Sequence, residues 1–237
     1  MATTKTIVMR ACLLSVGILI MSAGIALITK TYLGTSPISS FGYVLSIAFP
    51  QISYGVFMTA WNIVLLLGQV VILRRNFRAS ALLQLPISVL FSIGLDGFSY
   101  LFSFVRPETY PGLLVMLFCG IAMLAFGVSC TVVANIVMSS GEAFVWAITS
   151  TTGWNFGHTK IGFDLFSVAL AAVASWFLLG SIQGIREGTL AAAIFTGLFA
   201  NVFIRLMGGA REPLPKRSSS DQKHDTNQEL SQERLAK

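Results

Sequence analysis

Asp164 is the residue whose type and surroundings most suggest chemistry, because it is a carboxylate inside a long apolar run. A charge at the centre of a bilayer costs at least about 3 kcal/mol, so a carboxylate there needs a partner or a role. A buried carboxylate that binds and releases a proton could couple transport to a proton gradient. The alternative is that Asp164 lies near the membrane surface and pairs with Lys160, four residues earlier on the same helix face. Both interpretations stay open.

Asn62 is the counterpart of Asp164 in an internal repeat that relates the two halves of the chain. Glycines and polar residues of the first half reappear in the second half at offsets of 103 or 102 residues. The matched residues are Gly17 with Gly120, Gly24 with Gly127, Gly55 with Gly157 and Asn62 with Asp164. We therefore expect Asn62 and Asp164 to occupy related positions, with only Asp164 able to bind a proton.

Each half also contains a helix-start sequence that could bind a polar or anionic solute. Ser36 and Pro37 fit an N-cap and a first helical position. In the second half, Ser140 with Gly141 and Glu142 forms a weaker version. The free N–H groups and the dipole at a helix start favour negative charge. We predict that these five residues and the repeat-related pair form a substrate-binding site, although Glu142 could simply stabilise its own helix start.

Other chemistries find little support in the sequence. Ser139, Ser140 and His158 could be imagined as a nucleophile and its base, but neither serine lies in a G-x-S-x-G sequence. There is no P-loop sequence, and the two His and three Cys residues lack the spacing of a metal site. The basic residues lie at the ends of apolar runs, which disfavours nucleic-acid binding. We expect no catalysis, no cofactor and no metal.

The composition indicates what kind of structure must position these residues. Hydrophobic residues make up 54% of the chain and charged residues only 11%, whereas a soluble domain carries about a quarter charged residues. Of the 26 charged residues, 11 lie in residues 208–237. We therefore predict a transmembrane domain at residues 1–207 and a disordered cytoplasmic tail at residues 208–237, whose polar composition cannot support a core.

Six apolar runs are long enough to cross a membrane as helices, which takes roughly 20 residues each. The first run follows Lys5 and Arg10, as in a signal peptide, but it is longer than most signal-peptide cores and lacks a clear cleavage sequence, so we treat it as a retained span. Pro86 is expected to kink the third span. The fold class is an all-α integral membrane protein, with spans at residues 11–29, 54–73, 80–103, 112–134, 160–180 and 188–207.

Each half, about residues 11–103 and 112–207, contains three spans, so the second repeat must enter the membrane from the opposite side. Inverted repeats of this kind are typical of secondary transporters, whose substrate site lies between the halves. A cytoplasmic N-terminus places ten Lys and Arg residues in cytoplasmic segments and three outside, as the positive-inside rule requires. We predict a bacterial plasma-membrane protein with both termini in the cytoplasm. The duplication could also serve only to build a symmetric bundle.

Between the first two spans of each half lies a segment too short to cross the bilayer. Residues 38–49 and 143–151 follow the two helix starts, and a helix of 12 residues is only about 18 Å long. Each segment must lie in the interface or enter the membrane and return, which requires protein or water around its backbone. The repeat therefore contains a short interfacial or re-entrant helix in each half.

Short glycine-rich sequences mark both halves. They are Gly24-Ile-Ala-Leu-Ile, Leu33-Gly34-Thr-Ser-Pro37 and Ser53-Tyr-Gly55 leading to Asn62 in the first half, and Gly141-Glu142, Gly153, Gly157, Asp164 and Gly184-Ile-Arg-Glu-Gly188-Thr189 in the second. With this pattern, residues 8–207 resemble the YczE/YyaS/YitT group of bacterial membrane proteins. The resemblance implies a multi-span topology and an unassigned biochemical role. Ser140-Gly141-Glu142 stands where the group leads us to expect Pro-Gly-Asp.

The leading hypothesis is a six-span carrier or permease that moves a small polar or anionic solute through a site between the halves. The alternative is a non-transporting membrane module, either a substrate-binding subunit of a larger transporter or a scaffold. A polar cavity containing Asn62 and Asp164 would favour transport, and a dry seam of Gly and Ala would favour a scaffold. The lipid bilayer is the one partner that the sequence predicts.

Overall fold

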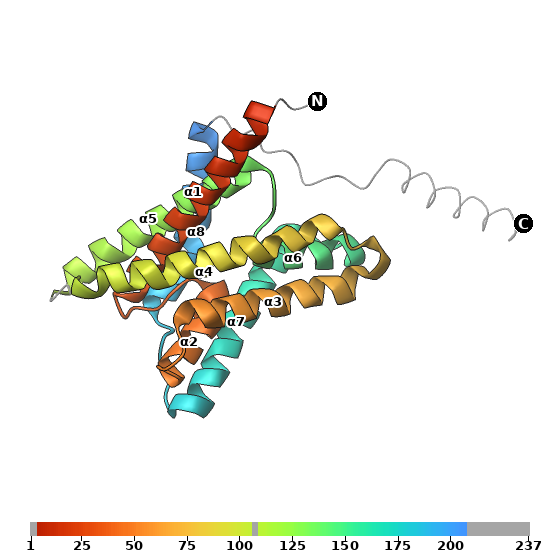
Figure 1. Ribbon diagram of the computed structural model, residues 1–237. Helices are drawn as coiled ribbons and strands as arrows, with labels where there is room; N and C mark the ends of the chain where they lie inside the picture. The colour runs from red at the N-terminus through yellow and green to blue at the C-terminus, as the bar shows by residue number, and fades with distance from the viewer. Residues whose placement is uncertain (1–3, 106–108, 208–237) are drawn as a thin grey trace, which may run out of the picture. The chain divides into compact units, whose positions relative to one another are not determined.

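The computed structural model describes residues 4–105 and 109–207, with side chains from residue 7 onward. The regular elements of this part are helices, including short 3-10 segments labelled η (Figure 1). They are α1 (Thr4–Thr29), η1 (Pro37–Ser39), α2 (Ser40–Ala48), α3 (Tyr54–Leu73), η2 (Arg74–Asn76), η3 (Ala79–Leu83), α4 (Gln84–Leu101), η4 (Phe102–Phe104), α5 (Tyr110–Ala134), α6 (Ser140–Thr152), α7 (Phe156–Leu179) and α8 (Glu187–Leu206). The predicted tail at residues 208–237 lies outside the described residues.

Six of the described helical segments are long and apolar enough to cross a membrane, which confirms the six predicted spans. They begin and end within a few residues of the predicted positions, at Ile7–Thr29, Tyr54–Asn76, Ala79–Phe104, Tyr110–Ala134, Phe156–Leu179 and Glu187–Leu206. The two shorter predicted helices are also present, as η1 with α2 and as α6. The chain is therefore a multi-pass helical membrane protein.

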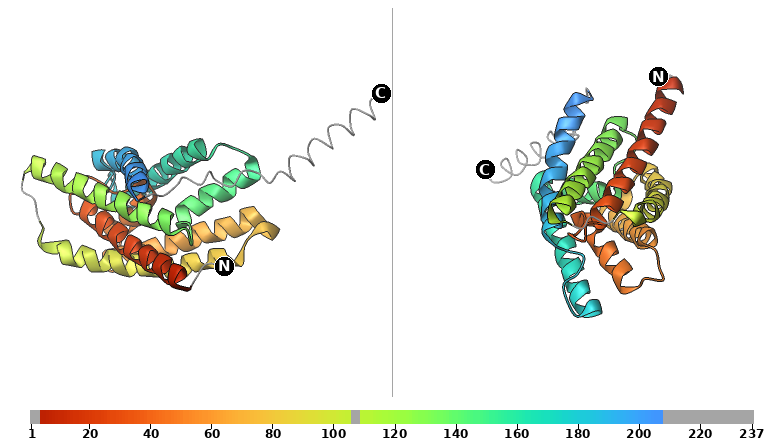
Figure 2. Two further views of the ribbon diagram at one scale, coloured as in Figure 1. Left: turned by 90° about the horizontal axis from the view of Figure 1, so that it is seen from above. Right: turned by 90° about the vertical axis from the view of Figure 1, so that its left-hand side faces the viewer.

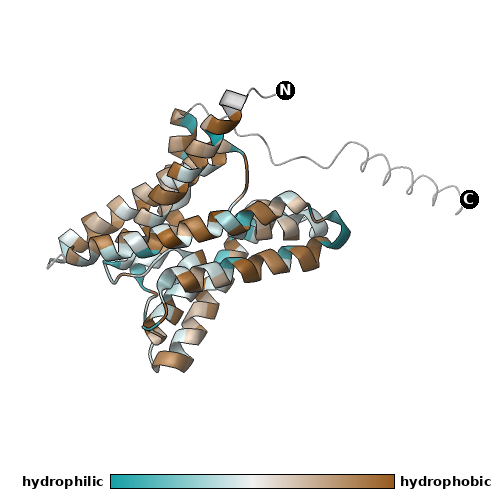
Figure 3. Cartoon of the chain, viewed as in Figure 1, coloured by the Kyte–Doolittle hydropathy of each residue, from teal (hydrophilic) through white to brown (hydrophobic). Residues whose placement is uncertain are grey.

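The outer faces of the spans are apolar, as contact with lipid requires. Phe177 and Leu206 have 82% and 76% of their surface exposed, and hydrophobic residues cover much of the helix surface (Figure 3). Hydrophilic residues gather at the connection between α3 and α4, where Arg74 and Arg75 lie. A water-soluble protein rarely exposes so many large apolar side chains in continuous patches.

Helices α1 and α5 lie side by side and make the most extensive contact among the described helices (Figure 2). Glycines on both helices lie at this contact. A Cβ atom on Gly24 would lie 2.5 Å from the Leu124 nitrogen and 2.8 Å from the Gly120 oxygen, so only glycine permits this approach. Gly17 approaches Gly127 in the same way. Because Gly17 faces Gly127 while Gly24 faces Gly120, the two helices are antiparallel. Small residues at such contacts are what allows membrane helices to pack backbone to backbone.

The remaining helices pack around this pair in two groups. Helix α4 packs on α1, and α8 packs on α5. The second group is built from α3, α6, α7 and α2, with α6 against α3 and α2 against α7. There are two apolar cores: one contains Ile18, Ile28, Leu95, Leu117 and Ile121, and the other contains Trp61, Leu65, Val145 and Phe163. The first core also contains Tyr54 and Met58 of α3, so it joins the two groups.

A carboxylate on α4 fixes the start of α3. Asp96 accepts hydrogen bonds from the Ser53 hydroxyl at 2.6 Å and from the Gly55 backbone N–H at 2.8 Å. Ser53 is itself the N-cap of α3 and accepts from the Val56 N–H. A negative charge next to a helix start complements the helix dipole. Asp96 thus ties α3 to α4 at this end of the hairpin.

Two details of the helices differ from the sequence prediction. Helix α6 begins with Ser140, so its N-cap is Ser139, whose backbone is extended, and not Ser140. The Ser139 side chain makes no capping bond to the helix backbone, but it interacts with the Glu142 side chain. Pro86 lies in the first turn of α4, where its missing N–H would have no acceptor within the helix. We expected Pro86 to kink the third span, but its position near the start of α4 means that it does not interrupt the helix interior.

Candidate functional site

A cavity of about 520 Å³ lies inside the part of the chain that the structure describes. Its lining comes from α1, η1, α3, α4, α5, α6, α7 and α8, and thus from both halves. This volume lies within the usual range of small-molecule sites, about 300–1,000 Å³. All seven residues predicted to bind substrate contribute to the lining: Ser36, Pro37, Asn62, Ser140, Gly141, Glu142 and Asp164.

The starts of the two short helices meet at this cavity. A Cβ atom on Gly141, near the start of α6, would lie 2.8 Å from the Ile38 side chain of η1. Glycine at this position therefore lets the two helix starts approach each other. Ser36 is the N-cap of η1 and Pro37 is its first residue, as predicted. The two helix-start sequences, 103 residues apart in the chain, are thereby brought into one site.

Hydroxyl groups form a connected network on the first-half side of the cavity. The Ser39 and Ser36 hydroxyls lie 2.7 Å apart, and the Ser39 and Thr35 hydroxyls lie 3.0 Å apart. The Thr35 N–H donates to the Thr189 hydroxyl of α8 at 3.2 Å. These hydroxyl and N–H groups are hydrogen-bonded to one another, so few of the described donors on this side of the cavity are free to bind a ligand.

An amide pair that the sequence analysis missed joins three helices beside the cavity. Gln69 of α3 and Gln84 of α4 exchange two side-chain hydrogen bonds of 3.1 Å, and Gln69 also donates to the Ser140 carbonyl of α6 at 3.3 Å. Both glutamines are buried. Polar side chains in membrane helices usually find partners on neighbouring helices. The two glutamines in otherwise apolar runs were the signal for this contact.

Asp164 and Lys160 form an ion pair at the cavity wall. The Lys160 ammonium donates to both oxygens of Asp164, and the two side chains are 27% and 22% exposed. The pairing that we left open as the alternative is therefore present. Both residues also line the cavity. The predicted proton-coupling role of Asp164 stays a prediction.

Glu142 is the second carboxylate of the cavity. Burial of its carboxyl raises its pKa above the ordinary value, and nearby Asp164 adds to this effect. The Lys160 ammonium and the hydrogen bond from Ser139 act in the opposite direction. Because Lys160 gives its hydrogen bonds to Asp164, Glu142 keeps only a longer-range attraction to that ammonium. Glu142 thus combines the predicted capping role with a place in the cavity lining.

The charged residues of the cavity all come from the second half. Glu142, Lys160 and Asp164 are its ionisable lining residues. The first-half residues at the matching offsets are Ser39, Met58 and Asn62, which are neutral and also line the cavity. The matched lining positions are therefore neutral in the first half and charged in the second.

The rest of the lining is mostly apolar. Met21, Ile25 and Phe91 are examples, and Phe156 adds a second aromatic ring. Thr196 of α8 also lines the cavity, and its buried hydroxyl has no hydrogen-bond partner within the described part of the chain. A site with a few polar groups in an apolar wall suits a small organic molecule.

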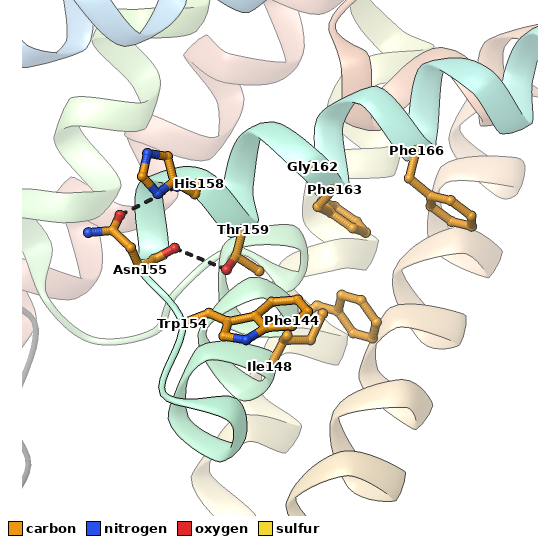
Figure 4. A pocket seen from close by; sticks show the side chains of 9 residues that line it. All are labelled: Phe144, Ile148, Trp154, Asn155, His158, Thr159, Gly162, Phe163 and Phe166. Carbon is orange, nitrogen blue, oxygen red and sulfur yellow. Dashed lines mark hydrogen bonds between the residues drawn. The ribbon is translucent and has the colours of Figure 1, made fainter.

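A second, apolar hollow of about 620 Å³ lies along α6 and α7 (Figure 4). Trp154, Phe144 and Phe166 line it, and the His158 imidazole points away from the tryptophan. Asn155 accepts hydrogen bonds from the Gly157 and His158 N–H groups and so caps α7. Neither Ser139 nor Ser140 lines this hollow, so the residues imagined as a nucleophile and base are not brought together here.

The apolar spans and the cavity that they line define a multi-pass membrane protein with a candidate binding site between its helices. Residues 8–205 match the model of a family of unknown function, DUF6198, and the chain belongs to this family. It is also 28% identical over 201 residues to the "Uncharacterized membrane protein YczE" of Bacillus subtilis (strain 168), covering 82% of this chain and 85% of the relative. The resemblance to YczE-type proteins is thereby confirmed. No solved structure matches the chain.

Proposed function

We propose that the chain is a carrier or permease that moves a small polar solute across a bacterial plasma membrane through the central cavity. The observation that carries this proposal is a cavity with polar and charged lining inside a bundle of apolar spans. Polar residues inside a membrane domain are costly, and they commonly mark the path of a substrate or an ion. The proposal assigns transport to the chain and no catalytic step.

We further propose that the two halves are inverted repeats. The positions at which helices begin support this, because three pairs of starts are 103, 102 and 103 residues apart: Pro37 and Ser140, Tyr54 and Phe156, Gln84 and Glu187. An odd number of spans in each half, together with antiparallel α1 and α5, agrees with opposite orientations in the membrane.

Side-chain contacts support the same relationship. Exchanging the halves converts the Gly17–Gly127 approach into the Gly120–Gly24 approach, which is also present. The aromatic pair Phe41–Trp61 of the first half has its counterpart in Phe144–Phe163, with ring centroids 5.0 and 5.3 Å apart. Repeated contacts of this kind are expected where two copies of one unit surround a shared site.

We propose that η1 with α2 and α6 are re-entrant and lie within the membrane domain. Their starts contact each other at the cavity, and both helices pack on spans of the opposite half. Irregular or short helical backbone is tolerated at membrane depth where protein surrounds it. The orientation that accompanies this proposal has both termini in the cytoplasm, because it places most Lys and Arg residues on that side.

The charges of the cavity refine the expected solute. Helix starts favour anions, and they led us to expect a polar or anionic solute. Glu142 and Asp164 place two carboxylates beside those helix starts, with Lys160 as the single ammonium of the lining. An anion would therefore meet repulsion that the sequence pattern alone did not predict. A polar solute without net negative charge agrees better with this lining.

Reconstitution tests the proposal. Purified protein in proteoliposomes should accumulate members of a mixed panel of small polar solutes, measured by mass spectrometry of the vesicle contents. Gly197 lines the cavity, and a Cβ atom there would meet nothing within 4 Å. Gly197→Leu should therefore fold, fill part of the cavity and lower uptake more than about tenfold, equivalent to losing about 1.4 kcal/mol of binding.

Gly162→Leu is the matched control. Gly162 lies on α7 beside the apolar hollow, and a Cβ atom there also meets nothing within 4 Å. Uptake by this variant should equal that of the unmodified protein. Equal uptake by the Gly197→Leu variant would contradict the proposed path.

The second candidate is a non-transporting membrane module, which the dry glycine contact between α1 and α5 favours. Such a module would show no uptake of any panel member when reconstituted alone. It would also co-purify with a partner protein from mild detergent, and transport would appear only when that partner is present.

A further inference from the structure

The cavity contains one more carboxylate than it has ammonium groups. Among its lining residues, Glu142 and Asp164 are acidic and Lys160 is basic. Lys160 donates its hydrogen bonds to both oxygens of Asp164, so these two charges balance each other. Glu142 is then left with the Ser139 hydroxyl as its hydrogen-bond partner. An ionised Glu142 therefore requires a positive charge from elsewhere, or it must bind a proton.

Among the described residues that line the cavity, Lys160 and Asp164 are the ionisable groups besides Glu142. Helix α7 contributes Lys160 and Asp164, which face Glu142 closely enough to act on it. The polar lining residues Ser36 and Ser39 at η1 and Asn62 of α3 are neutral. The lining residues of α4, α5 and α8 are also neutral. A cation that enters the cavity would therefore find an uncompensated negative charge on Glu142.

The remaining wall suits a cation that also carries apolar groups. Phe91 and Phe156 offer aromatic rings, and cations are attracted to the faces of such rings. Met21 and Met58 add flexible, polarisable side chains that adapt to irregular ligands. The Thr196 hydroxyl, buried and without a partner among the described residues, can accept one hydrogen bond from a ligand. A strongly hydrated inorganic cation would gain little from this wall.

We propose that the cavity binds a small monovalent organic cation, with Glu142 as its counter-ion, and that the cation and a proton compete for this carboxylate. The proposal rests on the cavity being the transport site. When the cation binds to protonated Glu142, the carboxyl O–H bond breaks, the proton leaves to solvent, and the carboxylate keeps the electron pair. One positive charge enters and one leaves, so the charge of the cavity is unchanged. In a carrier, this competition would exchange one proton for one cation.

The pH dependence follows from the same competition. The carboxylate form binds the cation, so binding is strong above the pKa of Glu142 and weakens as the pH falls through that value. Because burial raises this pKa, the loss of binding begins at a higher pH than for an exposed glutamate. Below the pKa, the apparent affinity should fall about tenfold for each pH unit.

Binding to the purified full-length protein in detergent tests this inference without any measurement of flux. The probes are tetraethylammonium chloride and choline chloride, with sodium methanesulfonate as the anionic comparator. Calorimetry gives the affinity at several pH values, and a pH indicator in weakly buffered solution gives the protons released. We expect cation binding with close to one proton released per cation in the pH range where Glu142 is protonated. We expect no binding of methanesulfonate.

Three variants separate the role of Glu142 in binding from its role in folding. Glu142→Gln keeps a side chain that can cap the helix start but cannot ionise; it should lose proton release and at least about tenfold in affinity. Glu142→Asp keeps the carboxylate and should retain proton release. Glu187→Gln removes an acid of α8 that lies outside the cavity and pairs with Arg186, and it should behave as the unmodified protein.

Several results would overturn the inference. These are preferential binding of methanesulfonate, no binding of either cation at millimolar concentration, or cation binding that is unchanged in Glu142→Gln. Release of a proton by Glu142→Gln would also overturn it. Transport of a neutral or anionic solute without effect of the cations would sink this inference and leave the proposed function intact. Cation binding with proton release but no flux would contradict the proposed function and leave this inference intact.

Discussion

At the scale of single residues, the pair formed by Lys160 and Asp164 is the main difference between the halves. The first half has Met58 and Asn62 at the matching positions, so these two positions are neutral in the first half and hold an ion pair in the second. Asp164 was predictable as an unusual residue from its apolar surroundings alone. Its partner was also foreseeable, because residues four apart share a helix face. Glu142 was placed in the same predicted site from its position at a helix start, and it lines the same cavity as Asp164. How closely α6 approaches α7 was not predictable, because the sequence does not encode that contact locally.

Replacing Asp164 by Asn should destabilise the protein, because Lys160 keeps its charge and loses its partner. Both side chains are roughly a quarter exposed, at 27% and 22%, so water screens part of the effect and the expected loss is about 1–2 kcal/mol of unfolding free energy. Thermal unfolding of the purified protein in detergent measures it.

The double variant Lys160→Met with Asp164→Asn is the control, because it gives the second half the residues of the first half. It should recover at least half of the lost stability. If Asp164→Asn unfolds at the same temperature as the unmodified protein, the ion pair contributes nothing to the fold.

At the scale of helices, the sequence predicted where helices form better than it predicted which helices pack against each other. The span predicted at residues 54–73 coincides with α3, because the length of an apolar run is itself the physical requirement for crossing a bilayer. The start of α6 was misplaced by one residue, since neighbouring serines compete for the N-cap. The Gln69–Gln84 pair could not be placed, because it depends on how α3 folds back on α4.

The two helix hairpins are not equivalent in the structure. Thr59 of α3 donates a hydrogen bond to Ser92 of α4 at 2.6 Å, which holds these helices together. The residues at the matching offsets are Ile161 and Phe195. Ile161 lines the cavity, whereas Phe195 packs against Phe118 of α5 at a ring-centroid distance of 5.2 Å. Helices α3 and α4 therefore pack on each other, whereas the described residues of α7 and α8 form no comparable contact.

Cysteine cross-linking tests this difference. In a background without Cys12, Cys119 and Cys130, the variant with Thr59→Cys and Ser92→Cys should form a disulfide on mild oxidation, because a disulfide needs Cα atoms within about 7 Å. The matched variant with Ile161→Cys and Phe195→Cys should remain reduced. Equal cross-linking of both pairs would mean that the hairpins are equivalent in the membrane. Mass spectrometry of tryptic peptides distinguishes the outcomes.

At the scale of the whole transmembrane domain, a polar cavity and a dry glycine contact coexist. The cavity contains both Asn62 and Asp164, which we expected of a transporter. The contact of α1 with α5 has the close packing that we expected of a scaffold. The two features are adjacent, because Met21 of α1 and Leu124 of α5 lie at the glycine contact and also line the cavity. They are compatible if this pair of helices is fixed while the surrounding helices enclose a space.

The proposed orientation makes a direct prediction about two arginines. Arg75, between α3 and α4, should face the cytoplasm, and Arg186, between α7 and α8, should face outward. In the same cysteine-free background, Arg186→Cys should react with a membrane-impermeant maleimide in intact cells. Arg75→Cys should react only after the cells are permeabilised. Labelling of both from one side would remove the inverted arrangement and the cavity between repeats.

The glycine contact between α1 and α5 also limits how the domain can move. The two backbones approach closely at two levels, Gly17 with Gly127 and Gly24 with Gly120, so the helices have little room to slide past each other. Separation or rotation of either helix about its own axis would break both levels at once. Any rearrangement that admits or releases a ligand should therefore keep α1 and α5 fixed relative to each other. The other helices that line the cavity should move around this pair.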